Sequence, residues 1–159
     1  AFTTVSADRT VTVDTAGDAN ALLGLEANSS GNGAYANTEG NQIVIDFSAN
    51  NLPTNGGNSA DGVNVDAETE ADDVFNVTNN GAQDIYFYVE TSGSSSVDVT
   101  LYDGADPSSG NLTGTSNYIQ INSGNQDSIG VSINTTGVTS TSEFNETVTI
   151  IATSEDPTA

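Results

Sequence analysis

The 159-residue chain contains no cysteine, histidine, lysine, methionine or tryptophan, and Arg9 is its one basic residue. Without histidine or cysteine it cannot build a Ser-His-Asp triad, a cysteine nucleophile or an ordinary zinc site. Without lysine it has neither a Schiff-base amine nor the lysine of a phosphate-binding P-loop. Paired carboxylates acting on a glycoside are the catalytic alternative that these absences leave open. We expect the chain not to be an enzyme.

Acidic residues dominate what is present. There are 22 Asp and Glu residues, and the formal net charge is -21 at pH 7. In molar salt the Debye length falls to about 3 Å, so such charges barely repel one another there. This composition predicts a protein of an extreme halophile. A field this negative repels nucleic acid and anionic membranes, so neither is an expected partner. The 35% hydrophobic content, in regular alternation, argues against an acidic disordered tail.

The first residues indicate a processed, secreted protein. The chain begins Ala1-Phe2 and has no methionine, as expected after cleavage of a secretory signal behind small residues. No run approaches the roughly 18 apolar residues of a membrane span, so we expect none in the mature chain. We therefore expect an extracellular, cell-surface location, with a fold that depends on its own apolar core because disulfides are absent.

Apolar residues recur with a period of two along most of the chain, which predicts β-strands. Asn, Gly, Asp and Ser clusters separate the runs at spacings typical of a sandwich, so we expect one all-β domain of about eight to ten strands. Asn79-Asn80-Gly81 predicts a hairpin turn between two of them. Two segments break the pattern: Asp18 to Glu26 as a short helix or turn, and Leu52 to Asp73 as a long loop. The apolar runs centre on Val11, Ile43, Val77, Phe87, Val99, Ile119, Val131 and Ile150.

The N-terminal run is longer than one sandwich needs. From Phe2 to Val13 it would span roughly 40 Å, whereas a sandwich strand is about 20 Å long. One interpretation is a strand bent near Asp8-Arg9 that crosses between sheets. The other is a strand that leaves its own domain and pairs with an edge of a neighbouring subunit. Because donor and acceptor surfaces differ, such a contact propagates into a fibre.

The opening AFTTVSADRTVTVDTAGDANALLGLE resembles the mature start of secreted haloarchaeal surface proteins, which are related to archaeal bundling pilins and to the TasA and camelysin biofilm-fibre proteins. DVFNVTNNGAQDIYFYVE is similar to the strand-Asn-Gly-strand hairpin of that group. SGNQDSIGVSINTTG and ETVTIIAT resemble its closing strands.

The resemblance implies a jelly-roll-like or immunoglobulin-like β-sandwich, residues 15–159, with a donor strand at residues 1–14. It implies a homopolymer of identical subunits, a pilus or biofilm-matrix fibre, assembled by donor-strand complementation. The alternative is a monomeric, secreted cell-surface binding or adhesion module, with calcium or sugar as candidate ligands. The donor positions carried onto this chain are Phe2, Val5, Ala7, Val11 and Val13. In the alternating run, Arg9 falls on the same face as these positions. Its side chain therefore contacts either buried acids and carbonyls or, in the simpler interpretation, water.

Two acidic clusters are candidates for calcium, which accepts oxygen ligands in flexible loops. The first contains Asp66, Asp72 and Asp73, and the second contains Asp103 and Asp106. Neither matches the twelve-residue calcium loop, and an acidic coat produces such clusters by chance. We therefore expect no cofactor, with calcium as the alternative.

Five Asn-x-Ser/Thr sequons are candidates for N-glycosylation in a secreted protein. They lie at Asn28, Asn76, Asn111, Asn134 and Asn145. The loop-like surroundings of Asn28 and Asn111 favour these two as acceptors. The number of sequons is what this content of Asn, Ser and Thr gives by chance.

Overall fold

The computed structural model describes residues 9–16, 23–29, 31–39, 42–46, 66–92, 98–137 and 144–159. Within these ranges the chain forms ten strands and two short 3-10 turns, and no helix there is long and apolar enough to cross a membrane. The all-β prediction is confirmed. The strands are β1 (Arg9–Ala16), β2 (Leu23–Ala27), β3 (Ala36–Glu39), β4 (Gln42–Asp46), β5 (Glu68–Asn79), β6 (Ile85–Ser92), β7 (Asp98–Asp103), β8 (Ile119–Ile121), β9 (Gln126–Asn134) and β10 (Phe144–Thr153). The 3-10 turns are η2 (Gly31–Tyr35) and η3 (Pro107–Ser109).

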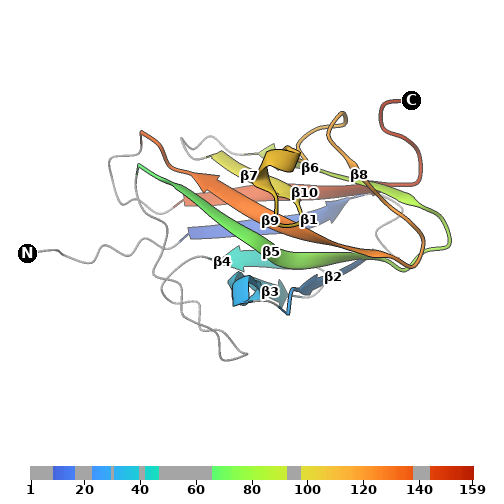
Figure 1. Ribbon diagram of the computed structural model, residues 1–159, viewed down its shortest axis with the longest axis horizontal. Helices are drawn as coiled ribbons and strands as arrows, with labels where there is room; N and C mark the ends of the chain where they lie inside the picture. The colour runs from blue at the N-terminus through green and yellow to red at the C-terminus, as the bar shows by residue number, and fades with distance from the viewer. Residues whose placement is uncertain are drawn as a thin grey trace, which may run out of the picture.

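The strands form two sheets that pack as a sandwich (Figure 1). The six-stranded sheet has the order β3-β4-β1-β10-β6-β8, and the four-stranded sheet has the order β2-β5-β9-β7. In Figure 1, β5, β7 and β9 lie in front of β1 and β10. Neighbouring strands are antiparallel with one exception, because β1 runs parallel to β10.

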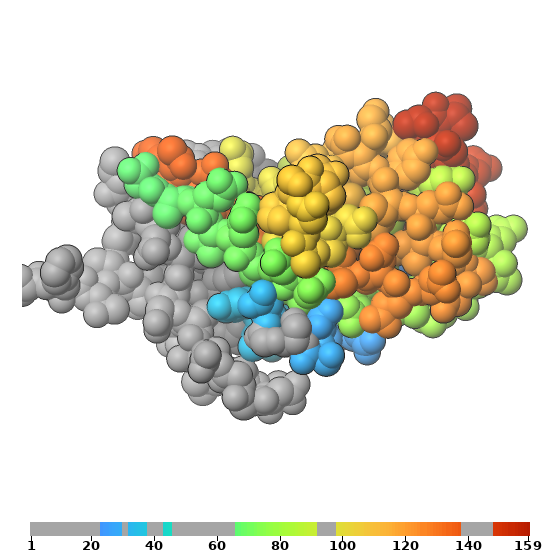
Figure 2. Space-filling model, in the orientation of Figure 1, coloured from blue at the N-terminus to red at the C-terminus, as the bar shows by residue number. Residues whose placement is uncertain are grey.

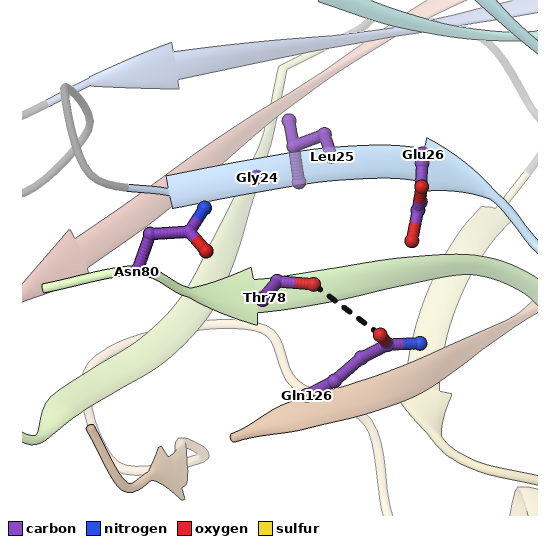
Figure 3. Close-up of a pocket in the computed structure, with 6 residues that line it drawn as sticks. All are labelled: Gly24, Leu25, Glu26, Thr78, Asn80 and Gln126. Carbon is purple, nitrogen blue, oxygen red and sulfur yellow. Dashed lines mark hydrogen bonds between the residues drawn. The ribbon is translucent and has the colours of Figure 1, made fainter. Parts of the chain in front are cut away.

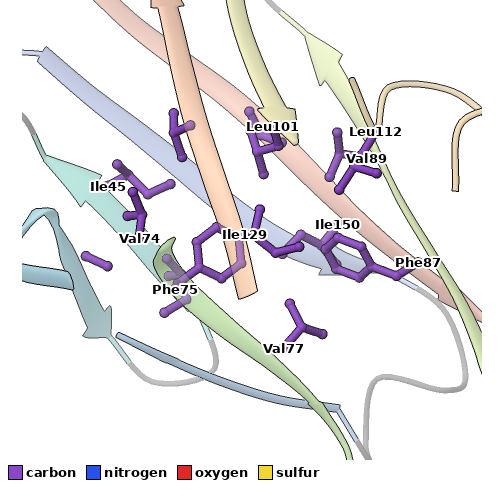
Figure 4. Close-up of a cluster of buried hydrophobic side chains, with 14 of the residues drawn as sticks. Ile45, Val74, Phe75, Val77, Phe87, Val89, Leu101, Leu112, Ile129 and Ile150 are labelled. Atoms are coloured by element: carbon purple, nitrogen blue, oxygen red, sulfur yellow. The ribbon is translucent and has the colours of Figure 1, made fainter. Parts of the chain in front are cut away.

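The inward-facing side chains of both sheets make one apolar core (Figure 4). Phe75 and Ile129 from the four-stranded sheet and Phe87 and Ile150 from the six-stranded sheet are each 0% exposed. These residues are the inward positions of the period-two runs, since successive side chains of a strand point to opposite faces. The alternation in the sequence therefore located the core.

The turn at Asn79-Asn80-Gly81 does not close a hairpin, and that prediction is wrong. β5, before the turn, pairs with β2 and β9, whereas β6, after it, pairs with β10 and β8. The turn carries the chain from one sheet to the other. An Asn-Gly signal marks a change of direction, but it does not determine which strands pair afterwards.

Two further expectations are corrected. Leu23–Ala27 is not helical but forms edge strand β2, which pairs with β5, and its Leu-Gly-Leu-Glu-Ala order has a period of two. The expected loop from Leu52 to Asp73 is strand from Glu68 onward, where residues 68–71 pair with β9 although Glu68 and Glu70 are charged. Asp66 and Ala67 form the turn before β5, and residues 52–65 lie outside the described residues.

The side chain of Asn79 ties the sheet corner together. Asn79 is 1% exposed, and its Nδ2 donates to the carbonyl oxygens of Gln83 at 2.8 Å and Ile121 at 3.0 Å. Its Oδ1 accepts a hydrogen bond from the Gly81 backbone N at 2.9 Å. The amide thus uses both its donor and acceptor capacity to join the end of β5 to the turn and to β8.

We predict that Asn79→Ala lowers the free energy of unfolding by about 2 to 4 kcal/mol, because it leaves buried carbonyls without donors. Urea denaturation followed by circular dichroism measures the loss. Asn80→Ala is the matched control, since Asn80 is the exposed neighbour, and it should change stability by less than about 0.5 kcal/mol. Equal effects of the two variants would show that Asn79 does not hold this corner.

Candidate assembly site

β1 fills a slot between β4 and β10 in the six-stranded sheet. It pairs in parallel with β10 along its whole length, from Arg9 opposite Phe144 to Ala16 opposite Ile151. On its other side it pairs antiparallel with β4, from Thr10 opposite Asp46 to Val13 opposite Ile43. Without β1, the sheet would divide into β3-β4 and β10-β6-β8, and two rows of backbone groups would lose their partners.

The walls of this slot belong to the core. Ile43 and Ile45 on β4, and Val148 and Ile150 on β10, are each 0% exposed. The register places Val13 between Ile43 and Val148. The core is therefore closed only when a strand occupies the slot, and the backbone pairing is the same whichever chain supplies that strand.

The predicted donor positions divide into two groups. Phe2, Val5 and Ala7 lie outside the described residues. Arg9, Val11 and Val13 lie on β1, where the structure describes their backbone pairing. The division into residues 1–14 and 15–159, the donor role of these positions and the environment of the Arg9 side chain stay predictions.

The first acidic cluster is spread along β5 and the turn before it. Asp72 accepts a hydrogen bond from Tyr102 Oη at 2.7 Å, and Asp66 accepts one from the Gly137 backbone N at 2.9 Å. Asp73 has a positive φ of 50° and lies at a β-bulge, where the pairing of β5 with β9 shifts between Ala71 and Phe75. The hydrogen bond of Asp72 holds the bulge against β7, the strand of Tyr102, whereas that of Asp66 joins the turn before β5 to the segment after β9.

The bulge also depends on a glycine that the sequence signalled only weakly. The ring of Tyr102 lies over Gly130, where an added Cβ would come within 2.3 Å of the ring. An isolated glycine inside a strand pattern indicates such a close approach. Burial, followed by the hydrogen bond and charge of Asp72, raises the pKa of Tyr102 above its ordinary value. Tyr102 therefore acts as a neutral donor to Asp72 at physiological pH.

The second acidic cluster has separate structural roles. Asp106 caps η3 by accepting a hydrogen bond from the Ser108 backbone N at 2.9 Å, and its hydrogen bonds to Ser108 lower its pKa. Asp103 lies beside Asp127 of β9. Among the described residues, no three His, Cys, Asp or Glu side chains gather as metal ligands. Calcium binding by Asp66, Asp72, Asp73, Asp103 or Asp106 stays a prediction.

A shallow depression of about 320 Å³ lies on the four-stranded sheet (Figure 3). Its lining is mainly polar, and Thr78 Oγ1 donates to Gln126 Oε1 at 3.4 Å across β5 and β9. An added Cβ at Gly24 would lie 3.0 Å from Asn80 Nδ2, so the glycine leaves this space open. The lining comprises Gly24, Leu25, Glu26, Thr78, Asn80 and Gln126.

Residues 16–156 match the family described as protein of unknown function DUF1102. The match covers most of the chain, so the protein belongs to this family. It begins at the last residue of β1 and includes the strands β2 to β10. A search of curated proteins found no match.

The Asp103–Asp127 pair predicts a pH dependence of stability. Burial, followed by the charge of and hydrogen bond with Asp127, raises the pKa of Asp103 above its ordinary 3.8. The folded chain therefore binds a proton at Asp103 more tightly than the unfolded chain does. As the pH rises through the pKa of Asp103, the free energy of unfolding falls, because the fold must then hold two neighbouring carboxylates. Asp103→Asn removes the effect. It should raise the free energy of unfolding at about pH 7, and the gain should disappear towards about pH 3.

Urea denaturation at a fixed salt concentration across this pH range measures the difference. Asp98→Asn is the matched control, because Asp98 is an exposed residue of the same strand and its replacement also removes one negative charge. The same stabilisation in both variants would attribute the effect to net charge and not to the Asp103–Asp127 pair.

Proposed function

We propose that the chain is the structural subunit of an extracellular filament, either a pilus or a biofilm-matrix fibre. In the filament, the N-terminal segment that contains β1 occupies the slot between β4 and β10 of the next subunit. The observation that supports this proposal is the pairing of β1 with two strands at once, along its full length with β10. A strand with that position closes the core of whichever sandwich receives it.

Exchange of β1 conserves the native contacts. The ladder that β1 forms within its own chain and the ladder that it would form in a neighbour contain the same backbone hydrogen bonds. Domain swapping of this kind is a low-cost route to assembly, and a head-to-tail exchange that does not close produces a filament. A strand held within its own chain has a local concentration in the millimolar range, so high subunit concentration favours the exchange.

The charge of the chain sets the conditions for assembly. Each subunit carries a formal net charge of -21, so subunits repel one another in dilute salt. Raising the salt from about 0.1 M to about 1 M shortens the Debye length from about 10 Å to about 3 Å and removes most of that repulsion. The proposal is therefore a filament of a saline environment, in line with the halophile prediction.

A second candidate function is a monomeric cell-surface binding module. The observation that favours it is the depression in Figure 3, where Glu26, Thr78 and Gln126 offer hydrogen-bonding groups to a small polar ligand. A carbohydrate has the hydroxyl groups that such a surface binds. The two functions differ in solution, since a binding module acts as a single subunit and a filament subunit forms regular fibres in electron micrographs.

We predict that a free peptide with the sequence of residues 1–16 stops filament growth. The peptide can fill the slot between β4 and β10, but it carries no second slot for the next subunit. Fibre length in negative-stain electron micrographs should fall as the peptide concentration rises above that of the subunit. Full-length fibres in a large excess of peptide would contradict strand exchange.

A scrambled peptide of the same sixteen residues is the matched control, because it has the same charge and composition without the alternation of apolar positions. It should leave fibre length unchanged. Equal shortening by both peptides would indicate a general effect of added peptide.

A further inference from the structure

Two of the five sequon asparagines are joined to each other. Asn28 Nδ2 donates to Asn76 Oδ1 at 2.7 Å and to Ser128 Oγ at 3.1 Å. Asn76 is 9% exposed and lies opposite Ser128 where β5 pairs with β9, and Asn28 follows the last residue of β2. A sugar on Nδ2 of Asn28 would displace at least one of these hydrogen bonds, and Asn76 has little exposed surface for one. This pair is a polar tie across the sheet and a poor acceptor.

Asn111 has the opposite geometry. It is exposed, and its Oδ1 accepts a hydrogen bond from the backbone N of Thr113, the third residue of its sequon, at 3.1 Å. Leu112 between them is 4% exposed, donates its backbone N–H to Leu101 at 2.8 Å and accepts at its carbonyl from Val89 at 2.8 Å. The middle residue is thus held between β7 and β6, while Asn111 lies at the surface.

We propose that Asn111 is the acceptor of an N-linked glycan. A bond forms between its Nδ2 and the anomeric carbon of a saccharide carried on a lipid phosphate. The bond from that carbon to the phosphate oxygen breaks, and one Nδ2 proton is lost to the released phosphate or to water. Because Oδ1 is unchanged, the hydrogen bond from Thr113 survives. The inference rests on the proposed extracellular function, since lipid-linked saccharides are transferred to proteins outside the cytoplasm.

Asn134 shares the turn geometry but lies in a more crowded position. Its Oδ1 accepts from the Thr136 backbone N at 2.9 Å, and its backbone pairs with Glu68 on one side and Asp98 on the other. It is half-buried at the end of a strand with neighbours on both sides, whereas Asn111 adjoins an edge strand. The side chain of Asn145 lies outside the described residues.

The position of Asn111 gives the glycan a role. β7 is an edge strand of the four-stranded sheet, and its outer side is paired at Leu101 and Tyr102 by the segment of Asn111 and Leu112. Unpaired stretches of an edge strand promote association between sheets. Asn111 forms an isolated bridge with Tyr102 of β7 and follows η3, whose gold segment protrudes from the face shown in Figure 2. A saccharide there would cover the β7 edge, so that subunits join through the slot between β4 and β10 and not edge to edge.

The experiment is glycopeptide mass spectrometry of the protein isolated from cells that export it. Cleavage after aromatic residues gives peptide 103–118 with Asn111, peptide 3–35 with Asn28 and peptide 76–86 with Asn76, each with one sequon. We expect the glycan mass on peptide 103–118, with peptides 3–35 and 76–86 unmodified. Asn111→Gln and Thr113→Ala should each remove that mass, because either change destroys the sequon, while Thr113→Ala retains the asparagine.

An unmodified peptide 103–118 overturns the proposal, whether or not another sequon carries a glycan. Modification of peptide 3–35 or 76–86 overturns the distinction made from burial and hydrogen bonding. Electron microscopy of the same preparation distinguishes failure of the glycan proposal from failure of the filament proposal. Fibres whose Asn111 carries no glycan refute only the proposal that Asn111 is the acceptor. A glycan at Asn111 on a protein that forms no fibres refutes only the proposed filament function.

Discussion

The backbone ladder of β1 with β10 and β4 is the interaction on which the rest of this structure depends. The six-stranded sheet is continuous only because β1 joins its two parts, and the core beneath Ile43 and Ile150 is closed only because the sheet is continuous. Each hydrogen bond of such a ladder contributes on the order of 1 kcal/mol net. The ladder and the apolar core that it closes stabilise the subunit together. The subunit therefore folds only when a strand occupies the slot.

Disulfides do not stabilise the sandwich, since the chain has no cysteine. Ties between the two sheets come from a few buried positions. Asn79 links the end of β5 to β8, and Leu112 links β7 to β6 through its backbone. The acidic residues take part locally, as Asp72 does with Tyr102 and Asp106 does at η3. The negative charge therefore lies around a conventional apolar interior.

How far the sequence predicted the fold depends on the range of the interaction. The alternation of Ile129, Val131 and Ile133 predicted β9 and its buried face, because strand periodicity is a local property. The pairing of Arg9 with Phe144 could not be read in the same way, since the two residues are far apart in the chain and many registers satisfy the same alternation. The Asn-Gly turn was located, but its crossing between sheets depends on hydrogen bonds of Asn79 to residues that no local pattern identifies.

The candidate sites also divide into features that are visible in the local sequence and features that depend on contacts between distant residues. The sequons were visible as motifs, whereas their separation into a tied pair at Asn28 and Asn76 and an exposed position at Asn111 required the packing of three strands. The acidic clusters looked alike in the sequence and have different roles in the fold. Gly130 carried a weak signal, an isolated glycine in a strand, and the reason for it is the ring of Tyr102.

The most direct test of strand exchange is a disulfide between β1 and β4. Thr12 lies opposite Val44, and directly opposed residues of antiparallel strands have Cα atoms about 4.5 to 5.5 Å apart, which suits a disulfide. In the variant Thr12→Cys with Val44→Cys, these would be the chain's two cysteines. Filaments assembled under reducing conditions and then oxidised should give a ladder of covalent oligomers on a non-reducing denaturing gel. Oxidised filaments that dissolve into internally cross-linked single chains would show that β1 pairs with its own β4, and would contradict the account.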